Sequence, residues 1–283
     1  MMQKSIAGMI VCILMTATAA RAEHKLLITD VLDAKQVEAQ ASFEYVRLQQ
    51  SFDSRFGNGR AVVNSTESRY SLGAGVGYGL EVTASIPYVF SERTSLRSDA
   101  DAGILPEKRD GFGDFSFGAK YSLLDEKKNA PVSLVAGLNV KFDTAGGANN
   151  PGTKTTDVNP ILAVSKKLGH HTPYASYQAV ISNHGHADEH ILSVGVEREL
   201  NETVTFDARV DAAFATATDT LSSSESYDLE LASYLQLLHN FYLIPSVAVA
   251  TGSTSHNKGS NLFDMHFGSP FGVKAGLSLY YLF

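Results

Sequence analysis

The chain has 283 residues, a formal net charge of -7, no tryptophan and one cysteine, Cys12. An acidic chain without clusters of basic residues is a poor partner for nucleic acid, so we expect no nucleic-acid binding. Beyond residue 22 no run of about 20 apolar residues occurs, which excludes a membrane-spanning helix in that part of the sequence.

Residues 1–22 have the three parts of a secretory signal peptide: a positive start at Lys4, an apolar core, and small residues, Ala20 and Ala22, at the cleavage positions. Cleavage would remove Lys4 and Arg21 and lower the net charge by two, from -7 to -9. An uncleaved membrane anchor is the alternative, but the apolar run is short for a spanning helix. We therefore expect a signal peptide at 1–22, a segment at 23–36 that is periplasmic or plugs the interior, and a β-barrel at 37–283.

From Val37 onward, apolar residues recur on every second position, which is the period of a β-strand with one apolar face. The alternation predicts about twelve strands, at or near residues 37–45, 62–76, 80–90, 111–124, 131–142, 157–168, 173–183, 190–200, 202–216, 226–238, 241–252 and 269–283. The stretches around Pro160 and Pro245 are the least regular, because proline lacks the N–H group that pairs in a sheet.

The connections between these strands alternate between long and short. Long ones lie near 51–60, 92–110, 143–156, 184–189, 217–225 and 253–268. Long loops on one rim and tight turns on the other are typical of a transmembrane β-barrel. A soluble all-β protein would also alternate, but its strands are typically about five or six residues long, whereas a tilted membrane strand needs about ten. We predict a closed, antiparallel, all-β barrel in a Gram-negative outer membrane, with the lipid bilayer as its partner.

The final strand shows the apolar face most clearly. Its alternate residues are Phe271, Val273, Ala275, Leu277, Leu279, Tyr281 and Phe283. An ending of this kind is similar to the C-terminal signature of bacterial outer-membrane proteins, and the likeness implies that the barrel-assembly machinery recognises the strand that ends in Phe283. Aromatic residues near strand ends are expected to form girdles at the two membrane surfaces. They are Phe90, Phe142, Phe214 and Phe271 on one rim and Tyr121, Phe241 and Tyr281 on the other.

Charged and polar residues on the opposite face are candidates to line the interior. They are Glu67, Arg69, Glu81, Asp114, Lys120, Lys141, Gln178, Glu197, Asp207, Arg209, Asp211, Asp228, Glu230 and Lys274. Unpaired charges inside a narrow barrel are costly, so the mixed signs predict ion pairs or water. The interior is then either a narrow conduit with selective walls or a plugged, structural one.

Two motifs that suggest chemistry are weak. The glycine-rich "GAGVGYG" breaks the dinucleotide-binding pattern, because Tyr78 stands where a glycine is required. His184, His186 and His190 are the only histidines close enough to share a metal ion, and a solvated loop is the alternative. No histidine falls in the middle of a predicted strand and no G-x-S-x-G motif occurs, so we expect no enzyme, no catalytic residue and no cofactor.

The stretch "DGFGDFSFGAKYSLL" resembles a family of outer-membrane proteins associated with the meta-cleavage pathway of phenol degradation. That family has a strand of the form G-x-G-D-x-x-x-G-x-K-Y, matched here by Gly111, Gly113, Asp114, Gly118, Lys120 and Tyr121. The run "HKLLITD" near the start is similar to the family's opening. The resemblance implies a barrel that passes small hydrophobic or aromatic solutes and brings no catalytic or binding residues with it. The alternative is a non-transporting barrel with a structural or surface-interaction role.

Overall fold

The computed structural model describes residues 28–54, 57–98, 107–146, 151–183, 187–218, 222–258 and 264–283. The predicted signal peptide at 1–22, the start of the segment 23–36, and the metal candidates His184 and His186 lie outside the described residues. Among the described residues, no helix is long and apolar enough to cross a membrane.

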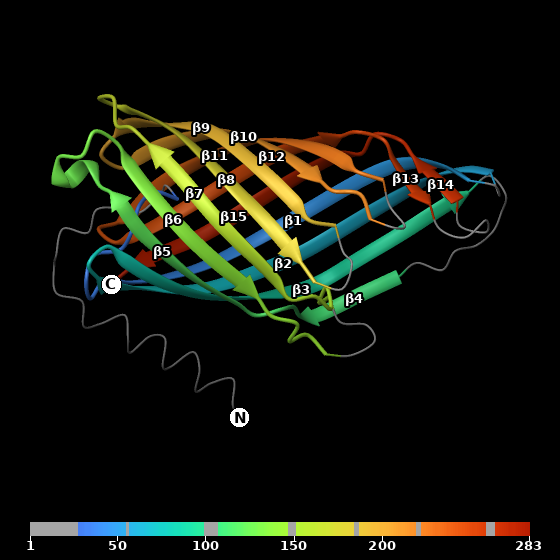
Figure 1. Cartoon of the computed structure of the whole chain (residues 1–283), viewed down its shortest axis with the longest axis horizontal. Coiled ribbons are helices and arrows are strands. Elements are labelled where there is room, and N and C mark those ends of the chain that lie inside the picture. Colours follow the sequence, from blue (N-terminus) through green and yellow to red (C-terminus); the bar gives the residue numbers. More distant parts are fainter. Residues whose placement is uncertain are drawn as a thin grey trace.

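Twelve antiparallel strands form a closed barrel, as the alternation predicted (Figure 1). The strands of the wall are β1 (Val37–Ser54), β2 (Gly57–Gly77), β3 (Leu80–Ser98), β5 (Ser116–Leu124), β6 (Ser133–Lys141), β7 (Asp157–Ser165), β8 (His171–Ser182), β9 (Glu189–Asn201), β10 (Val204–Ala215), β11 (Ser224–Leu238), β12 (Phe241–Gly252) and β15 (Phe271–Leu282). Each strand pairs with its neighbours in the sequence, and β15 pairs with β1 to close the wall. Closure leaves no open sheet edge for lipid to meet.

Three short strands extend the wall at the long-loop end. They are β4 (Glu107–Phe112), β13 (Ser255–Lys258) and β14 (Asp264–Phe267). β4 pairs with β3, and β14 pairs with both β1 and β13. β13 and β14 fall in the predicted connection 253–268, and most of β4 falls in the predicted connection 92–110. A strand outside the hydrocarbon layer needs no apolar face, so its sequence lacks the alternation that reveals the membrane strands.

The turns that join consecutive strands are short at one rim of the barrel, and the loops at the other rim are longer. The described N-terminal residues, the C-terminus and the short 3-10 helix η1 (Glu126–Lys128) lie at one end, and β13 and β14 lie at the other (Figure 1). Tight turns join the strands at the first end, including Tyr78–Gly79 between β2 and β3. In an outer-membrane barrel the tight-turn end faces the periplasm.

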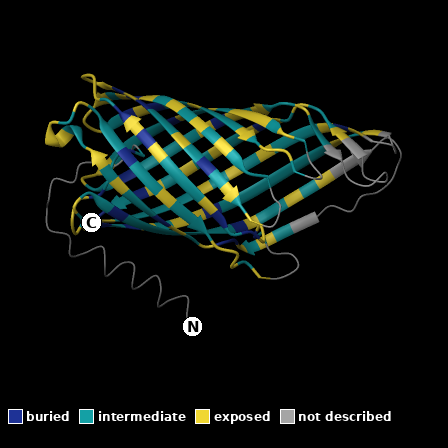
Figure 2. Cartoon of the chain, in the orientation of Figure 1, coloured by how far each residue is buried: buried dark blue, intermediate teal, exposed yellow. Residues whose placement is uncertain are grey.

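The outer face of the wall is apolar. Exposed and covered residues alternate along the strands (Figure 2). Large apolar side chains remain exposed from β2 to β15, among them Leu72, Phe117, Leu162, Val194, Val210, Val247 and Leu277. The predicted girdle residues Phe90, Phe142, Phe214, Phe271 and Tyr121 are also exposed. A continuous exposed apolar belt on a closed barrel matches the hydrocarbon layer of a bilayer.

Both irregular stretches are strands. Pro160 lies in β7 and Pro245 in β12. The register between β7 and β8 is interrupted at Pro160, and that between β11 and β12 is interrupted at Pro245. On their other sides, Pro160 stays opposite Leu138 and Pro245 stays opposite Leu277. A proline is therefore accepted in the wall because only one ladder loses its hydrogen bond.

Candidate functional site: the barrel interior

The residues predicted to line the interior stand at positions between the exposed apolar ones. Directly opposed residues on antiparallel strands share a face. Four predicted pairs are directly opposed: Glu81 with Lys120, Arg209 with Glu230, Asp211 with Asp228, and Glu197 with Asp207. The registers thus bring together side chains that lie far apart in the sequence.

Ion pairs hold the middle of the inner wall. Arg209 Nε donates to Asp211 Oδ2 at 3.0 Å, and Arg209 Nη2 donates to Glu230 Oε2 at 2.9 Å. Lys274 on β15 donates from Nζ to Asp228 Oδ2 at 2.6 Å. These two cations therefore have carboxylate partners on the same face, which lowers the cost of placing charge inside a barrel.

Further carboxylates make this wall acidic. Glu44, which was not among the predicted lining residues, lies directly opposite Glu67. Arg69 Nη2 lies 3.6 Å from Glu67 Oε1. Asp207 on β10 adds another carboxylate and is buried. A wall with more negative than positive charge favours cations over anions.

A buried tyrosine ties three strands together on the inner face. The Tyr174 hydroxyl on β8 donates to Asp207 on β10, at 2.9 Å from Oδ1 and 3.1 Å from Oδ2. Glu197 on β9, between these strands, is also buried. Tyr174 was not among the predicted lining residues, because aromatic residues were expected on the outer face.

The N-terminal segment lies inside the tight-turn end of the barrel. The Leu32 amide donates to Glu81 Oε2 at 3.0 Å. Lys120 Nζ, which lies 3.6 Å from Glu81 Oε1, donates to the Asp30 carbonyl at 3.0 Å. Thr29 Oγ1 lies 2.8 Å from Ser165 Oγ on β7. Inward side chains from β3, β5 and β7 therefore hold residues 28–32.

Apolar packing fixes the same segment from the other side of the barrel. Leu32 is 3% exposed and packs with Tyr242, Tyr280 and Leu282 of β12 and β15. The Tyr280 hydroxyl also donates to Glu38 Oε2 at 3.0 Å. This cluster is an apolar and aromatic patch on the inner side of the wall.

Gly75 on β2 lets the segment pass close to the wall. The Lys35 amide donates to the Gly75 carbonyl at 3.0 Å, and the Gly75 amide donates to the Gln36 carbonyl at 2.9 Å. A Cβ atom on Gly75 would lie 1.9 Å from the Asp33 carbonyl oxygen. Only glycine permits this approach, which explains one glycine of the "GAGVGYG" stretch without a nucleotide.

At the opposite rim, Asp114 anchors the connection between β6 and β7. Its Oδ1 accepts from the amides of Thr144 at 3.1 Å and Ala145 at 3.0 Å, and its Oδ2 accepts from the Thr153 amide at 2.8 Å. Burial raises the pKa of the Asp114 carboxyl, but the backbone donors of Ala145, Thr153 and Thr144 outweigh it and hold that pKa below its usual value. Asp114 therefore binds backbone amides from both described ends of the connection between β6 and β7.

A second contact fixes the same loop. Lys141 Nζ lies 2.5 Å from Asp157 Oδ2, and these residues are directly opposed on β6 and β7. Lys141 Nζ also donates to the hydroxyl groups of Thr153 and Thr155. Since Lys141 and Asp157 stand at inward positions, residues 153–155 are held on the inner side of the rim.

The backbone of the "GFGD" motif explains part of its composition. Gly111, at the end of β4, has a φ of 122°, which lies in the region that favours glycine. The chain then leaves β4 and reaches Asp114 two residues before β5 begins. The motif therefore combines a bend with a loop anchor.

Of the three histidines of the metal hypothesis, only His190 lies in the described part of the chain. His190 Nδ1 lies 2.8 Å from the Tyr177 hydroxyl, and their rings stack at 6.1 Å. Across the described residues, no group of three or more His, Cys, Asp or Glu side chains is arranged to hold a metal ion.

Residues 54–172 match a protein-family model described as "Putative MetA-pathway of phenol degradation". The fold is similar to that of the COG4313 outer membrane channel from Pseudomonas putida F1, with a TM-score of 0.63 and 12% sequence identity over 92% of this chain and 100% of that one. It is also similar to the translocator domain of the autotransporter NalP from Neisseria meningitidis, with a TM-score of 0.50 and 9% identity over 99% of this chain and 94% of that one. No protein with a curated description matches the chain in sequence.

The structural likenesses show the fold, a β-barrel of the outer-membrane type. The family match covers the motif from Gly111 to Tyr121 that carried the resemblance. The resemblance predicted from the sequence is therefore confirmed over residues 54–172, which are similar to the family described for the phenol-degradation pathway.

Proposed function

We propose that this barrel passes small hydrophobic or aromatic compounds across the outer membrane by diffusion, after export through a cleaved signal peptide. The family description names phenol degradation, and phenol is a small aromatic compound. The observation that carries the proposal is the apolar and aromatic patch of Leu32, Tyr242, Tyr280 and Leu282 inside the barrel. When residues 28–36 move away, Tyr242, Tyr280 and Leu282 offer an aromatic solute an apolar surface to bind.

Residues 28–36 act in this proposal as a plug at the periplasmic end, and the solute passes when the plug moves. Support comes from the polar contacts of Leu32 and Thr29 with Glu81 and Ser165, which hold the plug against the wall. The plug is linked to the wall by hydrogen bonds and by the packing of Leu32. A segment held in this way can open locally while the strands stay paired.

A disulfide between plug and wall tests the proposal. Thr29 Oγ1 and Ser165 Oγ are 2.8 Å apart, so cysteines at both positions can be joined. The only native cysteine, Cys12, lies in the predicted signal peptide. Oxidised Thr29→Cys with Ser165→Cys is expected to slow entry of phenol and other small aromatic solutes into liposomes, and reduction of the same sample is expected to restore it. Each single cysteine variant is the control and should not respond to oxidant.

Two outcomes would contradict the proposal in different ways. Equal uptake in the oxidised and reduced forms would show that the plug does not control passage. A folded barrel that passes no solute and gives no conductance steps in planar bilayers would favour the alternative, a structural or surface-interaction barrel.

A further inference from the structure

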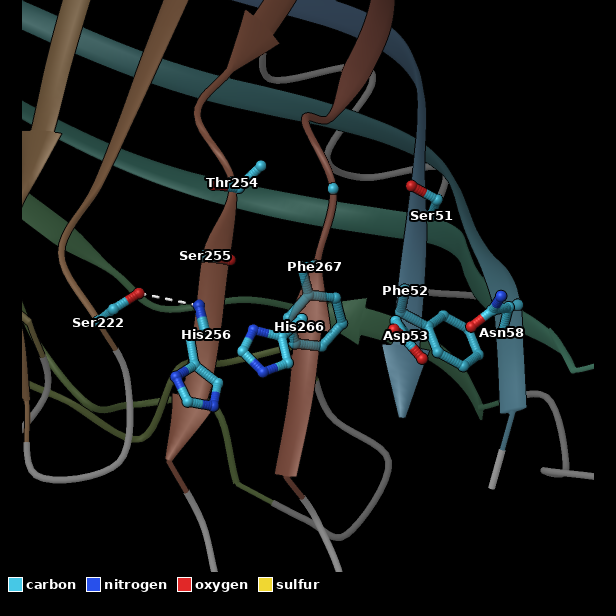
Figure 3. A pocket seen from close by; sticks show the side chains of 12 residues that line it. Ser51, Phe52, Asp53, Asn58, Ser222, Thr254, Ser255, His256, His266 and Phe267 are labelled. Atoms are coloured by element: carbon cyan, nitrogen blue, oxygen red, sulfur yellow. Dashed lines mark hydrogen bonds between the residues drawn. The ribbon is translucent and has the colours of Figure 1, made fainter. Parts of the chain in front are cut away.

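Two histidines and an aspartate form a row across three neighbouring strands at the long-loop rim. His266 on β14 lies directly opposite His256 on β13 on one side and opposite Asp53 on β1 on the other. Directly opposed residues share a face of the sheet. The row borders a cavity of about 600 Å³ whose lining includes all three residues (Figure 3).

The two imidazole rings are already in contact. Their centroids are 4.0 Å apart and their planes are 10° from parallel. The backbone of His256 is fixed on its other side, because its amide donates to Ser222 Oγ at 2.8 Å and its carbonyl accepts from the Ser222 amide at 2.9 Å (Figure 3). His256 is half-buried and His266 is exposed, so the pair is accessible from solvent.

We propose that His256 and His266 together bind one divalent transition-metal ion, Zn²⁺ or a similar ion, at this rim. Imidazole nitrogen is a preferred ligand of Zn²⁺, Ni²⁺ and Cu²⁺ and a poor one for Mg²⁺ or Ca²⁺. A pair of histidines directly opposed on antiparallel strands presents two such ligands from a rigid backbone. A small rotation of the stacked rings turns two nitrogens toward one ion.

The protein supplies two ligands in this site, and water completes the coordination. This agrees with the finding that no group of three or more metal-ligating side chains is assembled among the described residues. Asp53, opposite His266, adds a negative charge beside the pair that attracts a cation. A bound ion joins β13 to β14, and so ties together the hairpin that extends the wall between β12 and β15.

A calorimetric titration with ZnCl₂ tests the proposal. It uses the complete mature protein, without a tag, in detergent. We expect saturable binding of one Zn²⁺ per barrel, weakened about ten-fold or more by His256→Gln or His266→Gln, since each removes one of two ligands. His170→Gln is the matched control, because the His170 side chain is 82% exposed in a turn at the opposite end of the barrel. A second control is the pair His184→Gln and His186→Gln, which removes the two loop histidines.

A second measurement separates loss of the site from loss of the fold. All variants should keep the gel mobility of a folded barrel in unheated samples. Zn²⁺ should slow proteolysis between β13 and β14 in the native protein and in the control variants, but not in His256→Gln or His266→Gln. Absence of saturable binding in the native protein, or binding that survives the double variant His256→Gln with His266→Gln, would overturn the proposal. Neither result depends on whether the barrel passes aromatic solutes.

Discussion

At the scale of single residues, one carboxylate determines how a long loop meets the rim. Asp114 accepts three backbone N–H groups from residues 144–153, and its own motif supplies the bend that presents it. The sequence marked Asp114 as special through its motif and predicted an inward position, but it gave no indication of the partners. Those partners are 30 to 39 residues away and depend on which strands adjoin.

Asp114→Asn is expected to loosen the loop while the barrel still forms. Replacing a charged acceptor of several hydrogen bonds by a neutral amide should lower the stability of the attached loop by about 2 kcal/mol. Hydrogen exchange at the amides of Thr144, Ala145 and Thr153 measures the change. Unaltered protection of these amides in the variant would contradict the anchoring role.

The same contact predicts a dependence on pH. The pKa of Asp114 is lower in the folded protein than its usual value, so the anchor contributes its full stability above about pH 4, the ordinary pKa of an aspartate. That contribution is lost as the pH falls through the lowered pKa. Hydrogen exchange of the loop amides is compared between the native protein and Asp114→Asn at each pH, because the pH-dependent intrinsic exchange rate is then the same for both. The protection of the loop amides should become similar in the two proteins at acid pH. A constant difference in protection down to pH 2 would contradict the prediction.

At the scale of elements, the segment 28–36 lies inside the barrel and is not part of its wall. Its length before the first strand predicted either a plug or a periplasmic tail, and the sequence left both open. The choice depends on contacts with inward residues of β2, β3, β5, β7, β12 and β15. No local pattern encodes such contacts, because each partner comes from a different strand.

Gly75→Ala is expected to push this segment away from the wall. The new Cβ atom would lie 1.9 Å from the Asp33 carbonyl oxygen, a contact that only a backbone shift can relieve. We expect a larger single-channel conductance and faster proteolysis of residues 28–36, with unchanged folded-barrel mobility on gels. Gly146→Ala is the control, since a Cβ atom there meets nothing within 4 Å. Equal conductance in the two variants would argue against a plug.

At the scale of the whole molecule, lipid is the medium for the outer wall. Apolar side chains such as Val210 and Leu72 are 50% and 61% exposed, which a soluble protein of this size would not present as a continuous belt. The inner wall, in contrast, carries charged side chains, with Arg209 and Lys274 paired to carboxylates. A soluble protein has its apolar residues inside and its charged residues outside. The reverse arrangement follows here because an alternating sheet closes into a barrel within a bilayer.

A lysine on the middle of the outer wall tests the placement in lipid. Val210 lies near the centre of β10, so Val210→Lys should lower the free energy of unfolding in lipid vesicles by about 2–4 kcal/mol. Tyr78→Lys is the matched control, because Tyr78 is fully exposed in a tight turn and should tolerate the charge. Denaturant titration of both proteins gives the difference. Similar stabilities would mean that the centre of β10 does not face hydrocarbon.

The sequence by itself determined the class of fold, the number of wall strands and the family resemblance. It could do so because a bilayer imposes an alternation of period two on each strand separately. Each membrane strand can therefore be recognised from its own residues. The sequence did not reveal the strands β4, β13 and β14, since strands outside the membrane are free of that constraint.

Only the tertiary structure decided which residues meet. It set Arg209 opposite Glu230, and His256 opposite His266, and it brought Leu32 to Tyr280 from the two ends of the chain. The physical reason is that cross-strand partners depend on the register of neighbouring strands and on closure of the barrel. Both are properties of the assembled wall, and no single strand contains them.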